Sequence, residues 1–113
     1  MTNAKIRIIG ITATATALMA ANLLIAPARS EDKSAGSYKQ KCAACHGADG
    51  KADTPTGKSL KVRAFSDPAV TKMSDEDLAA VIDKGKGKMP GYSKSMKPDE
   101  IKAMVAFVRS LAK

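Results

Sequence analysis

The chain has 113 residues and a formal net charge of +8 at pH 7. That length allows one small domain and leaves little room for a second. With two tyrosines, two phenylalanines and no tryptophan, a hydrophobic core alone would stabilise such a domain weakly, so a disulfide, a metal or a cofactor is expected to contribute. A basic surface of this size favours negatively charged partners.

The N-terminal segment has the layout of a secretory signal peptide. Lys5 and Arg7 form a short positive region, and residues 8–28 carry no charge and end in Ala-Pro-Ala. We therefore expect residues 1–28 to be a signal peptide and residues 29–113 to form the mature domain in the periplasm. The uncharged stretch also reaches the lower limit of a membrane span, so the alternative is a retained anchor that holds the domain on the periplasmic face.

The sequence after this segment predicts helices and loops, and no strand pattern occurs in it. Residues 31–37 are small and polar, so we expect a flexible lead and a first helix that begins near residues 34–37. Residues 47–57, GADGKADTPTG, predict a loop that wraps around another group. Asp67 and Pro68 could then cap and begin a short helix, because the missing N–H of proline is harmless at the first helical position.

Two clearer helices follow. Ser74 is a good N-cap before three acidic residues that favour the positive end of a helix dipole, and Gly85 stops this helix. Residues 84–97, KGKGKMPGYSKSMK, lack apolar periodicity and predict a second loop. The last helix follows Pro98 and carries one apolar face at three- and four-residue spacing. The members of this face are Ile101, Met104, Val105, Val108 and Leu111.

The chemistry is carried by the motif Cys42-Ala43-Ala44-Cys45-His46. It places two thiols about one helical turn apart, so that both can bond the vinyl groups on one edge of a porphyrin. The adjacent His46 can then reach the iron from the same side. This pattern is the attachment signature of a covalently bound haem c, one per chain, through Cys42 and Cys45.

Three other uses of these cysteines are weaker. A zinc site needs four ligands, and the chain offers two Cys and one His. A thioredoxin-like redox pair would need a βαβ pattern, which the sequence lacks. A disulfide across two intervening residues would close too small a loop to constrain the unfolded chain.

With these segments in this order, the sequence resembles the small single-haem class I cytochromes c of bacteria, from about residue 34 to the end. The resemblance implies an all-α cytochrome c fold with three to five helices around one haem. It also implies that Tyr38 and Phe107 lie where the first and last helices cross, and that the carbonyl of Pro55 accepts a hydrogen bond from His46. The matching segments are Tyr38, CAACHG at residues 42–47, Pro55, GKGKMPGY at residues 85–92 and the last helix with Phe107.

The second axial ligand of the iron has to come from four methionines after residue 28. Met104 belongs to the apolar face of the last helix, where a core role is expected. Met73 and Met96 stand close to the starts of helices, where ordinary packing explains them. Met89 precedes Pro90 in an irregular loop, and this proline restricts the backbone so that the loop can hold the thioether in one place. Because similar proteins use the methionine of this Met-Pro segment, we expect Met89 as the ligand, with Met96 as the alternative.

Two features around this ligand loop are open to two interpretations. Arg63 and Tyr92 could hydrogen-bond a haem propionate, or could be a solvated arginine and a packed tyrosine. The lysines around the loop could steer the protein toward redox proteins with acidic docking faces, or could only keep it soluble. Export and the lack of interleaved aromatic residues argue against nucleic acid. These lysines are Lys84, Lys86, Lys88, Lys94 and Lys97.

Ligation by a histidine and a thioether leaves no open position on the iron, so electron transfer is expected rather than enzymatic turnover. The sequence thus predicts an exported, monomeric one-electron carrier that works between respiratory or other redox enzymes. It would contact the membrane only if the N-terminal segment is retained. One alternative is a dedicated cytochrome subunit of a dehydrogenase or oxidase. The other is a haem-based sensor or enzyme whose labile sixth ligand would let carbon monoxide bind.

Overall fold

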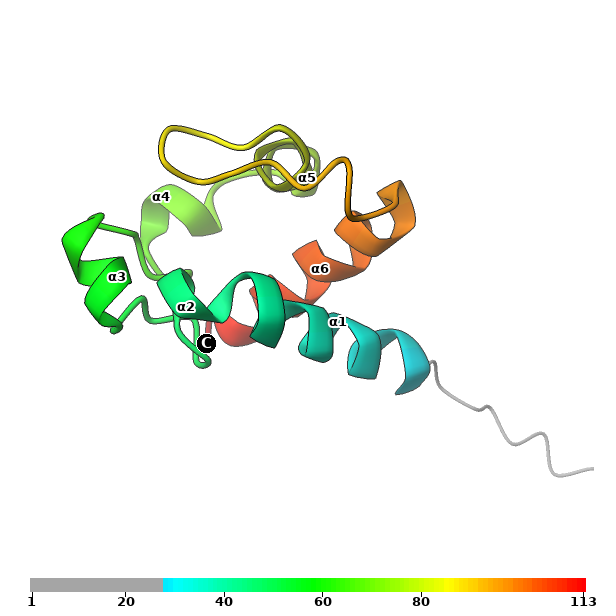
Figure 1. The fold of residues 1–113 in the computed structure, drawn as a ribbon, viewed down its shortest axis with the longest axis horizontal. Coiled ribbons are helices and arrows are strands. Elements are labelled where there is room, and N and C mark those ends of the chain that lie inside the picture. The colour runs from blue at the N-terminus through cyan, green and yellow to red at the C-terminus, as the bar shows by residue number, and fades with distance from the viewer. Residues whose placement is uncertain (1–27) are drawn as a thin grey trace, which may run out of the picture.

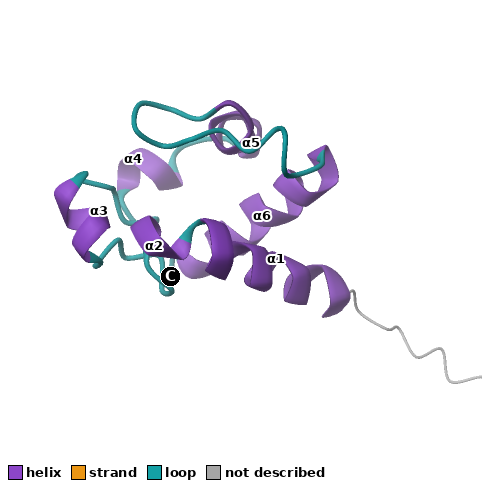
Figure 2. Cartoon of the chain, viewed as in Figure 1, coloured by secondary structure: helices purple, strands orange, loops and turns teal. Residues whose placement is uncertain are grey.

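The computed structural model describes residues 28–113, and these residues fold into helices joined by loops (Figures 1 and 2). The described part of the chain contains no strand, so the expected all-α fold is confirmed. Six helical segments occur instead of three to five, because three separate segments are only four or five residues long. In chain order they are α1 (Ala28–Lys41), α2 (Ala43–His46), α3 (Pro55–Ser59), α4 (Pro68–Thr71), α5 (Asp75–Lys84) and α6 (Pro98–Leu111).

The core forms where α6 packs on α1 and α5. Ile101, Met104, Val105 and Val108 are buried, as the spacing of the last helix predicts, and Met104 is the most deeply buried side chain. The rings of Tyr38 and Phe107 lie 5.2 Å apart between α1 and α6. The two aromatic residues therefore meet at the packing of the first and last helices, as expected.

The starts of α4, α5 and α6 agree with the sequence. The side chain of Asp67 accepts a hydrogen bond from the backbone of Ala69 at 2.8 Å, and Ser74 accepts one from Asp77 at 3.1 Å. Pro98 is the first residue of α6. These helices begin where a side chain supplies an acceptor for free backbone N–H groups or where proline removes one of those groups.

Two expectations about boundaries are wrong. The first helix begins at Ala28, so residues 31–37 are helical and do not form a flexible lead. Residues 47–57 do not form a loop throughout, because α3 starts at Pro55 with Thr54 as its N-cap. In residues 47–57 the turn-forming composition hid a local signal, because a Thr-Pro pair is a good helix start. In residues 31–37 the small, polar composition gave no sign that tertiary packing would bury Ser34.

The expected signal peptide, residues 1–28, lies outside the described residues apart from Ala28. Within residues 28–113, none of the helices combines the length and the apolar character that crossing a membrane would require.

Candidate haem-binding site

A cavity of about 450 Å³ lies inside the ring of helices, within the usual range for small-molecule and cofactor sites. Its walls are mostly apolar and come from all of the described helices except α3, together with the segment before α4 and the loop after α5. The four residues predicted to hold the haem, Cys42, Cys45, His46 and Met89, all line it. The sequence motif and the loop methionine, which are 43 residues apart at their closest, from His46 to Met89, therefore contribute to one site.

The cysteines are presented by a break between α1 and α2. The backbone N–H of Cys45 bonds the carbonyl of Cys42 at 3.2 Å, which leaves the carbonyl of Lys41 outside the helical pattern. Both cysteines are half-buried free thiols, and burial raises the pKa of Cys42. The break turns both thiols toward the same cavity, as bonding to one porphyrin edge requires.

His46 brings an imidazole to the wall of the cavity. Its Nδ1 atom is buried and has no hydrogen-bond partner within residues 28–113, which is uncommon for a buried polar atom. Burial also lowers the pKa of His46, so the imidazole is neutral at pH 7 and can coordinate a metal through a lone pair. A buried neutral imidazole beside two thiols and an apolar cavity fits an iron porphyrin.

The predicted partner of His46, the carbonyl of Pro55, is not bonded to Nδ1 in this structure. Pro55 instead forms the first residue of α3. The ring of His46 stacks on Phe65 with centroids 4.8 Å apart, and this contact holds its plane. Phe65 had no assigned role in the sequence, since nothing local links it to the motif.

We call residues 42–57 the attachment segment. The hydroxyl of Thr54 lies 2.9 Å from the carbonyl of Ala44 and 3.1 Å from that of Cys45, and it accepts a bond from Gly57 at 2.9 Å. At Gly57, an added Cβ would stand 2.6 Å from the carbonyl oxygen of Ala52 and in a clash with that of Cys45. Sequence reasoning missed this support, although the Thr-Pro pair at its centre is a recognisable helix start.

Residues 85–93, which we call the ligand loop, present Met89. Lys86 and Met89 exchange two backbone hydrogen bonds, at 3.1 and 3.0 Å, and so close a two-residue turn. The returning chain donates from Tyr92 to Ile82 at 2.9 Å and from Ser93 to Asp83 at 3.1 Å. These bonds satisfy carbonyls at the end of α5 that would otherwise lack partners, so the end of that helix anchors the loop.

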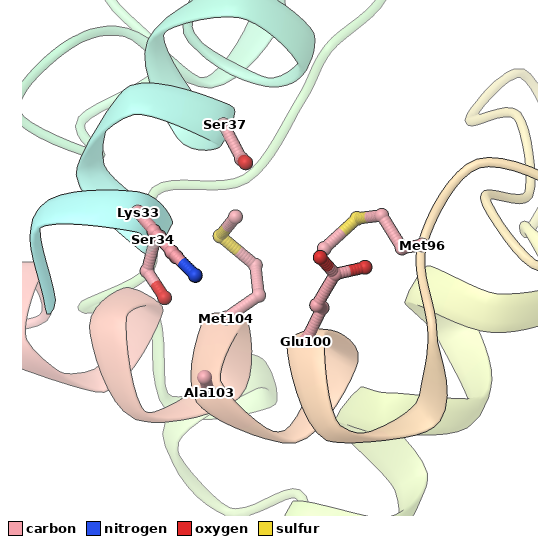
Figure 3. A pocket seen from close by; sticks show the side chains of 7 residues that line it. All are labelled: Lys33, Ser34, Ser37, Met96, Glu100, Ala103 and Met104. Carbon is pink, nitrogen blue, oxygen red and sulfur yellow. The ribbon is translucent and has the colours of Figure 1, made fainter. Parts of the chain in front are cut away.

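The other methionines are placed differently. Met96 is buried and does not line the cavity; with Met104 it faces a separate pocket of about 80 Å³ between α1 and α6 (Figure 3). Met104 is a core residue that also forms part of the cavity wall. Met73 lines the cavity too, just before α5, although the sequence indicated only packing for it.

Two polar residues at the edge of the cavity, Tyr92 and Arg63, differ in the hydrogen-bond donors that they have free. The hydroxyl of Tyr92 donates to the carbonyl of Lys41 at 2.9 Å, so its hydrogen is used within the protein. The side chain of Arg63 is 64% exposed and lies 3.8 Å from Asp67, which leaves most of its donors free for a propionate. Both residues line the cavity, and only Arg63 has donors to spare.

All five lysines around the ligand loop are exposed, and Lys86 and Lys88 also line the cavity. Across residues 28–113, no group of three or more His, Cys, Asp or Glu side chains is placed to hold a metal ion. The cavity therefore offers thiols, one imidazole and thioethers within a positively charged rim.

The comparisons with known proteins agree with this chemistry. Residues 30–108 match the protein family described as cytochrome c oxidase, cbb3-type, subunit III. A solved structure named "KustC0563 c-type cytochrome" is 35% identical and superposes with a TM-score of 0.65, over 71% of this chain and 98% of that one. No curated protein sequence gives a significant match.

A c-type cytochrome domain implies covalently bound haem c and, in general, electron transfer rather than enzymatic turnover. The family match covers well over half of the chain, and the solved neighbour is covered almost completely. The chain therefore belongs to this cytochrome family, as a small class I cytochrome c.

Proposed function

We propose that the protein is an exported carrier of single electrons, with one haem attached through Cys42 and Cys45 and with His46 and Met89 on the iron. The observation that carries the proposal is that one cavity is lined by the two thiols, the imidazole and the Met89 thioether. In Figure 1 the ligand loop follows α5 on one side of the ring of helices, and α2 lies on the other. Ligands from two sides suit a six-coordinate iron.

When bound, the haem supplies a reversible one-electron change at its iron. The protein's own residues set the conditions for this change. His46 donates a neutral imidazole and Met89 a thioether, a pair that raises the reduction potential relative to two imidazoles. The apolar walls of the cavity keep water from the iron, and two protein ligands leave no position for dioxygen. These features favour electron transfer over catalysis.

The test is spectroscopic and compares three variants that replace a thioether by a side chain of similar volume: Met89→Leu, Met96→Leu and Met73→Leu. The full chain is expressed in a host that attaches c-type haem. Haem that stays with the denatured polypeptide establishes covalent attachment. Loss of the methionine–iron charge-transfer band in Met89→Leu alone, together with new binding of carbon monoxide to the reduced variant, supports the ligand assignment. A band that survives in Met89→Leu contradicts it.

We further propose that the lysines of the ligand loop steer redox partners with acidic faces. Lys86 and Lys88 are exposed and stand at the cavity, where electrons would enter and leave. Replacing both by Gln should slow electron exchange with an acidic redox protein and flatten its dependence on ionic strength. Lys51 and Lys102, which are exposed and do not line the cavity, provide the matched double variant. Equal effects of the two pairs would contradict steering by this face.

The export proposal depends on the uncharged N-terminal stretch and the Ala-Pro-Ala that ends it. N-terminal sequencing of the haem-loaded protein from the periplasmic fraction should give Arg29 as the first residue. Recovery of the whole chain in the membrane fraction would favour the anchored alternative.

A second candidate function is a dedicated subunit of an oxidase, which the description of the matched family favours. It predicts that the cytochrome stays with an oxidase through gentle purification from its native source, whereas a shuttle separates from it.

A further inference from the structure

Tyr92 joins the two halves of the site through a single side chain. Its hydroxyl donates to the carbonyl of Lys41 at 2.9 Å, across 51 positions of sequence. Lys41 is the last residue of α1 and directly precedes Cys42. Tyr92 itself stands three residues after Met89, so this hydrogen bond connects the ligand loop to the helix that presents the haem-attachment motif.

The acceptor is available because of the break at Cys42. In a continuous helix the N–H of Cys45 would bond the carbonyl of Lys41, whereas here it bonds that of Cys42 at 3.2 Å. A carbonyl without a partner at a partly buried helix end is costly. Tyr92 supplies the partner, so the irregularity that directs the thiols into the cavity also creates the point at which the ligand loop is fastened.

The backbone of Tyr92 is equally well fixed. Its N–H donates to Ile82 at 2.9 Å, and its carbonyl accepts from Met96 at 2.9 Å. Between Met89 and Tyr92, Gly91 packs so closely on the end of α5 that an added Cβ would lie 2.6 Å from the carbonyl carbon of Lys84. Only Pro90 and Gly91 separate Tyr92 from Met89, and Gly91 lies against the end of α5, so movement of Tyr92 is transmitted to Met89.

We infer that Tyr92 is a positioning residue for the axial thioether: its hydrogen bond to Lys41 holds the ligand loop against α1 and so keeps Met89 on the iron. This inference rests on the proposed ligation by Met89. The hydroxyl does not bind the haem, because its hydrogen is committed to a backbone carbonyl. Opening the loop far enough to release the thioether breaks that bond.

The test uses imidazole as a competing ligand for the oxidised, haem-loaded protein. Tyr92→Phe keeps the ring and removes only the hydroxyl. Because a hydrogen bond of this kind contributes about 1 kcal/mol, imidazole should displace Met89 at about one-fifth of the wild-type concentration. The methionine–iron band should disappear in step with imidazole binding.

Tyr38→Phe is the matched control. Tyr38 also donates to a backbone carbonyl, that of Gly47 at 2.6 Å, but both residues lie on the attachment side. This variant should lose stability while its imidazole affinity stays within about twofold of wild type, since a bond that does not span the two halves is not broken by loop opening.

A double variant separates positioning from simple access. In Met89→Ala no thioether has to leave the iron, so adding Tyr92→Phe should change imidazole affinity little. Equal imidazole affinities for Tyr92→Phe and wild type would overturn the inference, as would an equal increase in the Met89→Ala background. If instead wild type lacks the band, or Met89→Ala keeps it, the ligand assignment itself fails, and this outcome is distinct from the failure of the tether.

Discussion

The attachment segment and the ligand loop each bring one proposed ligand to the cavity, but they are held in different ways. Gly47, Gly50, Ala52 and Gly57 of the attachment segment are buried, and the side chains of Tyr38 and Thr54 bond its carbonyls. In the ligand loop most residues are exposed, including Lys86, Gly87, Lys88, Pro90 and Gly91. Backbone bonds to the end of α5 and the hydroxyl of Tyr92 hold this loop.

This difference indicates where the site can open. Segments with few buried contacts and many exposed backbone groups open at low free energy, whereas buried segments open only with the whole domain. The His46 side should therefore be fixed by the fold, and the Met89 side should be the part that yields to competing ligands. Changes to the attachment segment should lower global stability, and changes to the ligand loop should mainly affect the sixth position of the iron.

The largest effect is expected from Gly57→Ala. A Cβ there meets the carbonyls of Cys45 and Ala52 in a buried, close-packed region, so the backbone has to shift and the free energy of unfolding should fall by about 3 kcal/mol. Denaturant unfolding of the haem-loaded protein, followed by circular dichroism, measures this loss in the free energy of unfolding. Gly36→Ala, at a helical position with open space around it, should instead stabilise by about 0.5–1 kcal/mol. If Gly57→Ala and Gly36→Ala are equally stable, the close packing around Gly57 does not contribute to global stability as proposed.

Gly91→Ala in the ligand loop should lower the free energy of unfolding less than Gly57→Ala does, but it should disturb the ligation of the iron more. The new Cβ would lie 2.7 Å from the carbonyl oxygen of Asp83, at the end of α5. The loop has to move away, which should lower the free energy of unfolding by about 1–2 kcal/mol. The move should also weaken the bond between Met89 and iron, so that the reduced protein binds carbon monoxide. A loss of global stability as large as that of Gly57→Ala, with the methionine–iron band intact, would show that the two regions do not differ as proposed.

The sequence predicted what depends on local pattern. Each of these features depends on residues that lie only a few positions apart in the sequence. They are the apolar spacing of α6, the caps of α4 and α5, and the attachment motif. The choice of Met89 combined a local argument, the restraint that Pro90 places on the loop, with resemblance to a family. The motif and Met89 line one cavity because the packing of α6 on α1 and α5 brings distant parts of the chain together.

Other parts of the site could not be read from the sequence. The stacking of Phe65 on His46 joins residues 19 positions apart, and the bond from Tyr92 to Lys41 joins residues 51 apart. The partner of His46 Nδ1 was assigned by analogy to Pro55, but a carbonyl acceptor depends on where the backbone passes, which no residue type encodes. The start of α3 was missed for a different reason, because Thr54 and Pro55 carried a local signal that the turn-rich composition obscured.

Within the attachment segment, Thr54→Val should have an intermediate effect. It removes the hydroxyl that bonds the carbonyls of Ala44 and Cys45 and caps α3, so a loss of about 1–2 kcal/mol in the free energy of unfolding is expected. Thr54→Ser keeps the hydroxyl and should recover most of that loss. If Thr54→Val is as stable as wild type, the hydroxyl does not contribute to the support of the motif.

The smallest effect should come from the ion pair beside that same hydroxyl. Asp53 and Lys58 lie 2.8 Å apart, yet their side chains are 69% and 71% exposed, and water and salt screen such a pair strongly. The hydrogen bond from Lys58 and its charge lower the pKa of Asp53. A lowered pKa means that any stabilisation is present above the carboxyl's unfolded pKa and is lost as the pH falls through the folded one. Asp53→Asn should therefore match wild type within error in 0.15 M salt at pH 7, and any difference seen at low salt should vanish below about pH 3. A large loss at pH 7 would mean that the attachment segment depends on its surface charges as well as on its buried backbone contacts.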